Sequence, residues 1–481
     1  MTDTTSKRLA KLLAAAAMLA VCAACAAQNP KYIFFFIGDG MSVPQRMAAE
    51  EFSRKIEGRG LTINAMPVQA MLRTCPVDSL VTDSAAAATA LACGVKTLNG
   101  AIGTDRHGAS VESCASAARK SGRKTGIITN TTLSHATPAC FFAHCKHRGQ
   151  YYDIAVDLAK SGFDFFAGGG LPDHGKTNET HWAEYGDAIK LAEANGYKVV
   201  RTKNDFLALA PGCGKTLSMF SKSHMEHSLD MDRERQPTLA EMLKKAIELL
   251  DNPDGFFIML EGGQIDFAGH GNDIGTNMRD MLAFDETVRV AQEFLEAHPG
   301  ETLIAVTGDH ETGGLSLGCT GAGYNFFIER VAGQTTGVDR FSNESRHMMR
   351  KRLEKGETPE FEETRDLVAK AFGFKFEGDP EKDPLVLSKS EYERIKSAFE
   401  NDVEYTRSKV AETKAHDAVR KYLLASTCRS ILAEKAGVSW GSAHHTALPV
   451  MATLQGAGAE NFAGYMENDE FGRRMKELCA R

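Results

Sequence analysis

Short apolar runs that end abruptly at a glycine or a polar residue are the clearest pattern in this sequence. Five such runs cover residues 32–37, 126–129, 163–166, 256–260 and 302–307, and Gly, Asp, Glu or Asn closely follows each of them. Because the runs show little polar alternation, they are typical of strands that are buried on both faces of a parallel sheet.

Helical patterns lie between these runs, at residues 84–93, 110–121, 152–161 and 238–250. The alternation predicts an α/β fold in which a central, mostly parallel sheet is flanked by helices on both faces. Ligands of such sheets bind beyond the carboxyl ends of the strands. The acidic residues and His310 occur at these ends.

The segment from about 324 to 440 has a different composition. It is rich in charged residues and helix formers, and it lacks the pattern of a strand followed by an acidic residue. We expect a largely helical insertion here, within one α/β domain that spans residues 30–481.

The N-terminus has the pattern of an export signal. Lys7, Arg8 and Lys11 precede an apolar run at 12–27 that is short and rich in alanine, which predicts a secretory signal over residues 1–25 and not a membrane-spanning helix. Ala23-Ala24-Cys25 resembles the end of a bacterial lipoprotein signal, with Cys25 as the lipid anchor. Cleavage after Ala26 is the alternative. We therefore expect an exported protein, either periplasmic or anchored by lipid to a bacterial membrane.

Composition and charge narrow the class of protein. Of 481 residues, 43% are hydrophobic and 25% are charged, which is usual for globular proteins and excludes disordered and multi-span membrane proteins. The net charge of -7 argues against recognition of nucleic acids, which requires a basic face. The nine cysteines that follow Cys25 are scattered, so they define no disulfide framework.

Ser84 is the first candidate for chemistry, because it opens an alanine-rich helix directly after Thr82-Asp83. Such a serine is either a helix N-cap or a nucleophile at the positive end of the helix dipole. No GxSxG sequence surrounds Ser84, so histidine activation of the hydrolase type is not indicated. A metal ion is the remaining means of activating its hydroxyl.

Candidate metal ligands follow several of the predicted strands. If the segment 261–270 enters a helix, Asp266 and His270, four residues apart, share one face of it. Sets of Asp and His suit zinc, whereas a set of oxygen donors suits magnesium. Two cations about 4 Å apart can bind the attacking and leaving oxygens of a phosphoryl transfer. The candidates are Asp39, Glu261, Asp266, His270, Asp309, His310 and His445, with Asp39, Thr137 and Glu261 as the oxygen set.

Seven strings, in order and spread over about 33–464, resemble the alkaline phosphatases, which are metal-dependent phosphomonoesterases with a serine nucleophile. The strings are IGDGM (37–41), TDSAA (82–86, continuing to GVKT at 94–97), HATPA (135–139), AH (143–144, leading to Arg148), EGGQID (261–266), DH (309–310) and HT (445–446). The resemblance implies hydrolysis of small phosphate monoesters to an alcohol and inorganic phosphate. It also implies a homodimer, unless the insertion blocks that interface.

The resemblance further implies a role for each residue, with two Zn²⁺ and one Mg²⁺ as cofactors. Ser84 would attack phosphorus and carry the phosphoryl group, while Arg148 would bind two phosphate oxygens and Asp83 would orient Arg148. One zinc, on the leaving-oxygen side, would be bound by Asp266, His270 and His445. The zinc that activates Ser84 would be bound by Asp39, Asp309 and His310, and magnesium by Asp39, Thr137 and Glu261.

Two positions differ from the best-known bacterial pattern. His135 stands where some members have Asp, and Phe267 stands where Lys or His helps to hold phosphate through water. Because Phe267 cannot donate a hydrogen bond, we expect phosphate to bind less tightly, and we expect His135 to alter the dependence on magnesium.

Two alternatives belong to other classes of function. A phosphodiesterase or sulfatase of the same superfamily is disfavoured by Arg148 and by the absence of a Cys-x-Pro-x-Arg string at Ser84. A non-catalytic surface protein that binds metals is disfavoured because Ser84 and Arg148 accompany the full ligand set.

Overall fold

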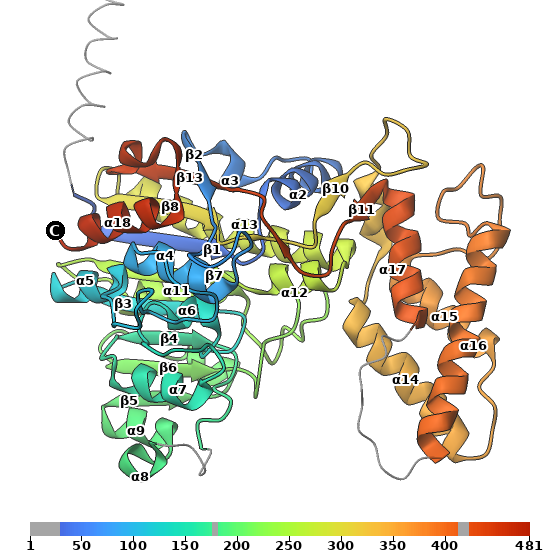
Figure 1. Cartoon of the computed structure of the whole chain (residues 1–481), viewed down its shortest axis with the longest axis horizontal. Helices are drawn as coiled ribbons and strands as arrows, with labels where there is room; N and C mark the ends of the chain where they lie inside the picture. Colours follow the sequence, from blue (N-terminus) through green and yellow to red (C-terminus); the bar gives the residue numbers. More distant parts are fainter. Residues whose placement is uncertain (1–28, 176–180, 412–422) are drawn as a thin grey trace, which may run out of the picture.

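The computed structural model describes residues 29–175, 181–411 and 423–481, and a sheet of ten strands runs through the described part (Figure 1). Its strand order is β14-β2-β13-β8-β1-β7-β3-β4-β6-β5. The strands are β1 (Tyr32–Gly38), β2 (Val68–Arg73), β3 (Lys124–Thr129), β4 (Phe165–Gly168), β5 (Tyr197–Val200), β6 (Lys215–Met219), β7 (Phe256–Gly262), β8 (Thr302–Gly308), β13 (Val450–Gly456) and β14 (Gly464–Glu467).

Nearly all neighbouring strands run parallel, and β13 alone among these ten runs antiparallel, to both β2 and β8. The predicted α/β class is therefore confirmed. All five predicted strands are present, as β1, β3, β4, β7 and β8, and each of these strands ends at the glycine or threonine that closes its apolar run. The sequence pattern did not predict β2, β5, β6, β13 and β14.

Helices cover both faces of the sheet because alternate side chains of the strands point in opposite directions. In β1, Phe34 and Phe36 pack on one face with α2, α11 and α13, whereas Ile33, Phe35 and Ile37 pack on the other with α4, α5, α7 and α18. These helices are α2 (Val43–Ile56), α4 (Ser84–Cys93), α5 (Cys114–Lys120), α7 (Tyr151–Lys160), α11 (Leu239–Leu250), α13 (Ile274–Ala297) and α18 (Asn468–Cys479).

Shorter elements complete the core. They are the helices α3 (Thr62–Ala65), α6 (Ala136–Ala139), α8 (Trp182–Tyr185), α9 (Ala188–Ala194), α10 (Lys203–Leu207) and α12 (Gln264–His270), the 3₁₀ helix η2 (Ala459–Phe462), and two small antiparallel pairs. The pairs join β9 (Glu311–Thr312) to β12 (His445–Thr446) and β10 (Leu315–Leu317) to β11 (Val438–Trp440).

The helix α4 packs closely against the C-terminal helix α18. All ten residues of α4 are buried, and most of them are alanine. Gly472 of α18 faces this helix, and a Cβ atom there would come within 2.1 Å of the carbonyl oxygen of Ala90. Small side chains on both helices therefore fix the position of the helix that begins at Ser84.

The described residues of the segment 324–440 form the 3₁₀ helix η1 (Ile328–Gly333), the strand β11 and the helices α14 (Val338–Glu354), α15 (Phe361–Phe372), α16 (Lys389–Ala411) and α17 (Leu423–Ala436). We refer to α14–α17 as the insertion helices. They lie beside α12, away from the sheet (Figure 1). The exact limits of the predicted insertion stay a prediction.

No helix in the described ranges is both long enough and apolar enough to cross a membrane. The predicted signal segment, with Cys25, lies outside these ranges. The nine cysteines from Cys75 to Cys479 are all free thiols, and six of them are buried.

Candidate active site

The carboxyl ends of neighbouring strands bring the predicted ligands together. Gly38, at the end of β1, is in register with Gly262 of β7 and with Gly308 of β8. Asp39 and Asp309 follow these ends directly, so their side chains emerge at the same edge of the sheet. This is the edge at which parallel sheets bind ligands.

Three groups of side chains at this edge place their potential ligand atoms within 4.8 Å of one another. The groups are Asp39, Asp309 and His310; Asp266, His310 and His445; and Asp39, His135 and Glu261. Four other residues predicted for the site contact members of these groups, namely Ser84, Thr137, Arg148 and His270. Asp83 contacts Arg148 instead.

The first group surrounds the hydroxyl of Ser84. His310 Nε2 lies 3.3 Å from Asp39 Oδ1 and 3.4 Å from Asp309 Oδ2, and Ser84 Oγ lies 3.2 Å from the same nitrogen. The other nitrogen of His310 contacts Thr312 Oγ1 at 3.2 Å. Burial and the neighbouring imidazole of His445 lower the pKa of His310 well below its usual value, so His310 is neutral, which is the form that binds metals.

The second group is formed by α12 and the β9–β12 pair. His270 Nε2 lies 3.2 Å from His445 Nε2 and 3.3 Å from Asp266 Oδ2, and His445 Nε2 lies 3.6 Å from Asp266 Oδ1. The Nδ1 atoms point away, to the carbonyl of Ala443 at 2.7 Å for His270 and to that of Thr82 at 2.8 Å for His445. A hydrogen bond from Nδ1 to a carbonyl fixes the tautomer that leaves Nε2 free for a metal.

The third group is more polar. His135 Nδ1 lies 2.9 Å from Glu261 Oε1 and 3.8 Å from Asp39 Oδ2. Thr137 donates a hydrogen bond of 3.3 Å to Asp39 Oδ2, and Thr131 donates one of 2.8 Å to Glu261 Oε2. The predicted oxygen set of Asp39, Thr137 and Glu261 is therefore brought together, with an imidazole added to it.

Two buried carboxylate oxygens of this cluster, Asp39 Oδ1 and Asp309 Oδ2, have no hydrogen-bond partner within the described ranges. Burial raises the pKa of both carboxyl groups well above the usual value, and the nearby charges of Asp266 and Glu261 act in the same direction. An uncompensated buried charge costs several kcal/mol. Bound cations would remove this cost, and carboxylate oxygens with imidazole nitrogens are donors that divalent metals accept. The residues therefore fit metal ions.

Arg148 lies at the rim of the cluster and is held by Asp83. Its Nη1 donates to Asp83 Oδ2 at 3.2 Å, and its Nη2 lies 3.3 Å from His135 Nε2. The carboxylate of Asp83 also caps α4, because Oδ1 accepts from the backbone N–H of Ala86 at 2.9 Å, while Oδ2 accepts from that of Gly100 at 3.0 Å. One side chain thus links the start of the Ser84 helix to the arginine.

Several supporting residues were not predicted from the sequence. Thr312 of β9 is paired with His445 of β12 and donates a hydrogen bond to Asp266. Its neighbour Glu311 accepts a hydrogen bond of 2.7 Å from Gln45 of α2. The small β9–β12 pair therefore positions His445. The strings DH (309–310) and HT (445–446) lie beside and on this pair, but they did not identify Glu311 and Thr312.

His224 and His227 were not among the candidate residues predicted from the sequence, and both are partly buried. The ring of His224 packs edge-on against Phe267, with centroids 4.7 Å apart, and lies 6.2 Å from the ring of His135. Burial and the nearby His135 lower the pKa of His224 to about 4. His227 contacts Asp280 at 2.6 Å. Both histidines follow β6, whose carboxyl end would have identified them as candidates had that strand been predicted.

Comparisons with known proteins point to one family. Residues 30–480 match the family described as alkaline phosphatase. Alkaline phosphatase 4 of Bacillus subtilis (strain 168) is 30% identical over 455 residues, a match that covers 91% of this chain and 86% of that protein. The repressible alkaline phosphatase of Saccharomyces cerevisiae is 34% identical over 325 residues, but that match covers 60% of this chain and 56% of the yeast protein, less than two thirds of its length.

Solved structures give the same result. The cold-active alkaline phosphatase from Shewanella sp. superimposes with a TM-score of 0.77 at 25% identity, covering 94% of this chain and all of that one. The Thermus thermophilus alkaline phosphatase has a TM-score of 0.75 at 26% identity, covering 95% of this chain and 93% of that one. Family match, relatives and fold agree, and the chain belongs to the alkaline phosphatase family of phosphomonoesterases.

Proposed function

We propose that this protein hydrolyses phosphate monoesters through a phosphoserine on Ser84, at a centre that binds two Zn²⁺ and one Mg²⁺. The observation that carries the proposal is the position of the Ser84 hydroxyl, 3.2 Å from His310 Nε2 and beside two buried carboxylates, each of which has one oxygen without a hydrogen-bond partner in the described ranges. A hydroxyl in this position can be activated by a cation without a separate general base.

Each cation has a proposed set of ligands. Asp39, Asp309 and His310 would bind the zinc next to Ser84, and Asp266, His270 and His445 would bind the second zinc. Asp39, Thr137 and Glu261 would bind magnesium, with His135 alongside. When bound, such cations lower the pKa of coordinated hydroxyl groups and offset the negative charge of the phosphoryl group.

The residues of the chain orient the ester for attack. Ser84 is the first residue of α4, so a phosphoryl group next to its oxygen lies at the positive end of the helix. Arg148 would bind two of the non-bridging oxygens with its planar guanidinium, a bidentate geometry that lysine cannot provide. Asp83 and His135 restrict the directions in which this guanidinium can point.

The reaction takes place in two displacements. Ser84 Oγ forms a bond to phosphorus as the bond from phosphorus to the alcohol oxygen breaks, and the alcohol leaves with a proton. Water then forms a bond to phosphorus as the bond to Ser84 Oγ breaks, which releases inorganic phosphate and restores the hydroxyl. The overall reaction consumes one water molecule and requires no oxidant or reductant.

Phosphate release from an aryl phosphate at mildly alkaline pH tests the proposal. We would compare the untreated protein, the chelator-treated protein and the treated protein with Zn²⁺ and Mg²⁺ restored. Activity should be lost with the metals and should return with them. Brief acid quenching of a reaction with ³²P-labelled ester should trap label on the wild-type protein.

Ser84→Ala is the matched variant for this experiment. We expect it to bind the same number of metal ions, measured by elemental analysis, and to trap no label. A metal-loaded wild-type protein that released no phosphate would contradict the proposal. A Ser84→Ala protein with wild-type labelling would contradict the assignment of the nucleophile.

We also propose that the protein is exported, because residues 1–25 have the pattern of a secretory signal. Phosphate monoesters outside the cytoplasm would then be its substrates. Lipidation of Cys25 would anchor the protein to a membrane, whereas cleavage after Ala26 would leave a freely diffusing form.

A further inference from the structure

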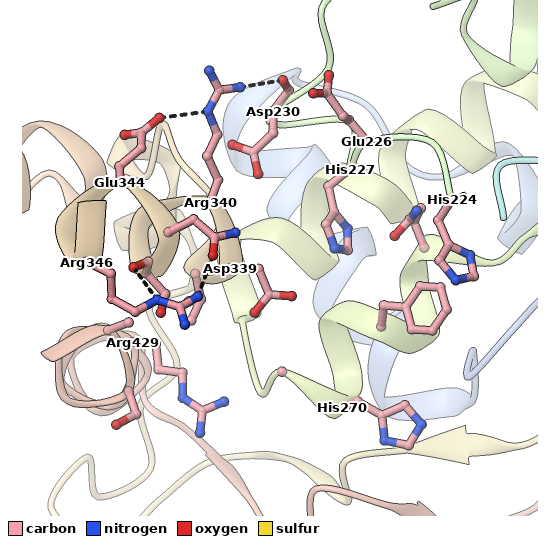
Figure 2. Close-up of a pocket in the computed structure, with 18 of the residues that line it drawn as sticks. His224, Glu226, His227, Asp230, His270, Asp339, Arg340, Glu344, Arg346 and Arg429 are labelled. Atoms are coloured by element: carbon pink, nitrogen blue, oxygen red, sulfur yellow. Dashed lines mark hydrogen bonds and ion pairs between the residues drawn. The ribbon is translucent and has the colours of Figure 1, made fainter. Parts of the chain in front are cut away.

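A cavity of about 950 Å³ separates the candidate metal site from the insertion helices. His270 and Phe267 of α12 line one side, together with His224. Arg346 of α14 and Arg429 of α17 line the other side, and Figure 2 shows the two sides facing each other. The cavity is thus a continuous space from a proposed metal ligand to two arginines of the insertion helices.

Arg429 is the most unusual side chain in this cavity. It is partly buried, and its Nε atom is fully buried without a hydrogen-bond partner in the described ranges. Asp273 and Asp339 are close enough to favour its charge, but neither forms a hydrogen bond or an ion pair with it. Burying a cation without a partner is costly, so a structural role alone does not explain this arrangement.

One of these two carboxylates, Asp273, already accepts hydrogen bonds from other donors. Asp273 accepts hydrogen bonds from the backbone N–H of Thr276 and of Val338, and from the side chains of Thr276 and Gln334. These four bonds use the lone pairs that an arginine would need. Asp273 therefore cannot become the partner of Arg429 without losing bonds that it already makes.

Of the other charged side chains that line the cavity, Arg340, Asp230 and Arg346 have partners. Arg340 donates to Glu344 at 3.0 Å and to the carbonyl of Asp230 at 2.8 Å. Asp230 accepts from the backbone N–H of Gly337 at 3.0 Å. Arg346 donates to the carbonyl of Ser342, within its own helix, at 3.2 Å. Arg429 therefore differs from its neighbours in having a guanidinium that is available to a ligand.

We propose that Arg429 binds a second anionic group, a phosphate or a carboxylate, on the alcohol part of the substrate. The preferred substrates would then be phosphate monoesters whose leaving alcohol is itself acidic. This inference rests on the proposed function, because it assumes that the leaving oxygen lies on the side of His270. His270 is 35% exposed and lines the cavity, so an alcohol that departs on this side extends toward Arg429.

The test compares substrates that differ only at the far end of the alcohol. The bisphosphates of unbranched α,ω-alkanediols with three to eight carbons would be compared with the matching ω-hydroxyalkyl monophosphates. We expect kcat/KM to be about tenfold higher for the bisphosphate at the chain length that spans the cavity, because a hydrogen bond between charged groups has about this effect. The matching ω-carboxyalkyl phosphates show whether phosphate or carboxylate is preferred.

Arg429→Gln should remove this preference without changing kcat/KM for the hydroxyalkyl phosphates. Arg429→Lys keeps the charge but not the planar fork, and should retain part of the preference. Arg350→Gln is the matched control, because Arg350 lies on α14, pairs with Glu354 and does not line the cavity. It should behave as the wild type.

A binding measurement keeps this inference separate from the proposed function. Alkane-α,ω-bisphosphonates and alkylphosphonates are not hydrolysed, so calorimetry can measure their binding alone. The Kd ratio, which is the Kd of the alkylphosphonate divided by that of the bisphosphonate, should be about tenfold lower in Arg429→Gln than in the wild type. The inference is overturned if wild-type protein shows no preference at any chain length, or if Arg429→Gln weakens both ligand classes equally. If the wild-type protein prefers the bisphosphonate as expected but hydrolyses no ester, the result would count against the proposed function alone.

Discussion

A substitution of Asp83 tests the site sharply, because its two carboxylate oxygens accept hydrogen bonds from different groups. Oδ1 caps α4 through Ala86, and Oδ2 holds Arg148 at 3.2 Å and Gly100 at 3.0 Å. In Asp83→Asn the amide oxygen can keep the cap, since Asn and Asp are equally good N-caps. The amide nitrogen then faces two other donors, so the contact with Arg148 is lost.

The size of the effect follows from the exposure of the pair. A hydrogen bond between charged groups contributes about 1.5–3 kcal/mol when it is well shielded. Arg148 is 29% exposed and Asp83 is 22% exposed, so solvent screening reduces this contribution to about 1–2 kcal/mol. This corresponds to a decrease in kcat/KM of about 5- to 30-fold.

The assay is steady-state hydrolysis of an aryl phosphate, with the inhibition constant for inorganic phosphate measured in parallel. Because we propose that Asp83 positions an arginine that binds phosphate, KM and the phosphate inhibition constant should both rise. Asp187→Asn is the matched control, because Asp187 caps α9 through Ile189 and pairs with His174 at 3.2 Å, far from the site.

Asp187→Asn should leave both constants unchanged, even if it lowers the midpoint of thermal unfolding by as much as Asp83→Asn. The reasoning is refuted if kcat/KM of Asp83→Asn stays within twofold of the wild type. It is also refuted if only kcat falls while phosphate inhibition is unaltered.

Three further predictions concern other parts of the molecule. Phe267→Lys should lower the phosphate inhibition constant roughly tenfold, because the new ammonium can bind phosphate; unchanged or weaker inhibition would contradict this. Burial lowers the pKa of His227, but Asp280 at 2.6 Å outweighs burial and raises it to about 9. Because the folded pKa lies above the unfolded value of about 6.5, His227 stabilises the fold fully below pH 6.5 and loses this effect as the pH rises through 9. His227→Gln should therefore cost roughly 2–3 kcal/mol in denaturant unfolding at pH 6 and much less at pH 10, and an equal cost at both values would count against the pair. Mass spectrometry of the mature protein should find one of two N-termini, a lipidated Cys25 or an unmodified Ala27, and a chain that retains residues 1–24 would contradict the predicted signal.

The sequence was most informative where an acidic residue directly follows a buried strand. Asp39, Glu261 and Asp309 were identified because each occurs at the end of an apolar run, and parallel strands bring their ends together. The strand β13 was missed because Val450–Gly456 mixes apolar and polar residues, as expected of an antiparallel strand near the edge of the sheet.

Residues whose role depends on distant packing could not be predicted in this way. His224 has no distinctive neighbours in the sequence and comes near His135 only through the arrangement of β3, β4 and β6. Arg429 belongs to an ordinary amphipathic helix, and its lack of a partner is evident only when the opposite wall of the cavity is known. Local patterns therefore identify ligands at strand ends, but not groups that meet across a cavity.

The place of the C-terminal segment in the fold has a consequence for biosynthesis. β13 lies between β2 and β8, and α18 packs on the helix that begins at Ser84. In a chain released before residue 445 has been added, β2 would have neither of its two neighbours in the sheet, His445 would be missing from its group and α4 would lack the helix that packs on it. Such a chain would carry nearly all of the proposed ligands and still lack a complete candidate site.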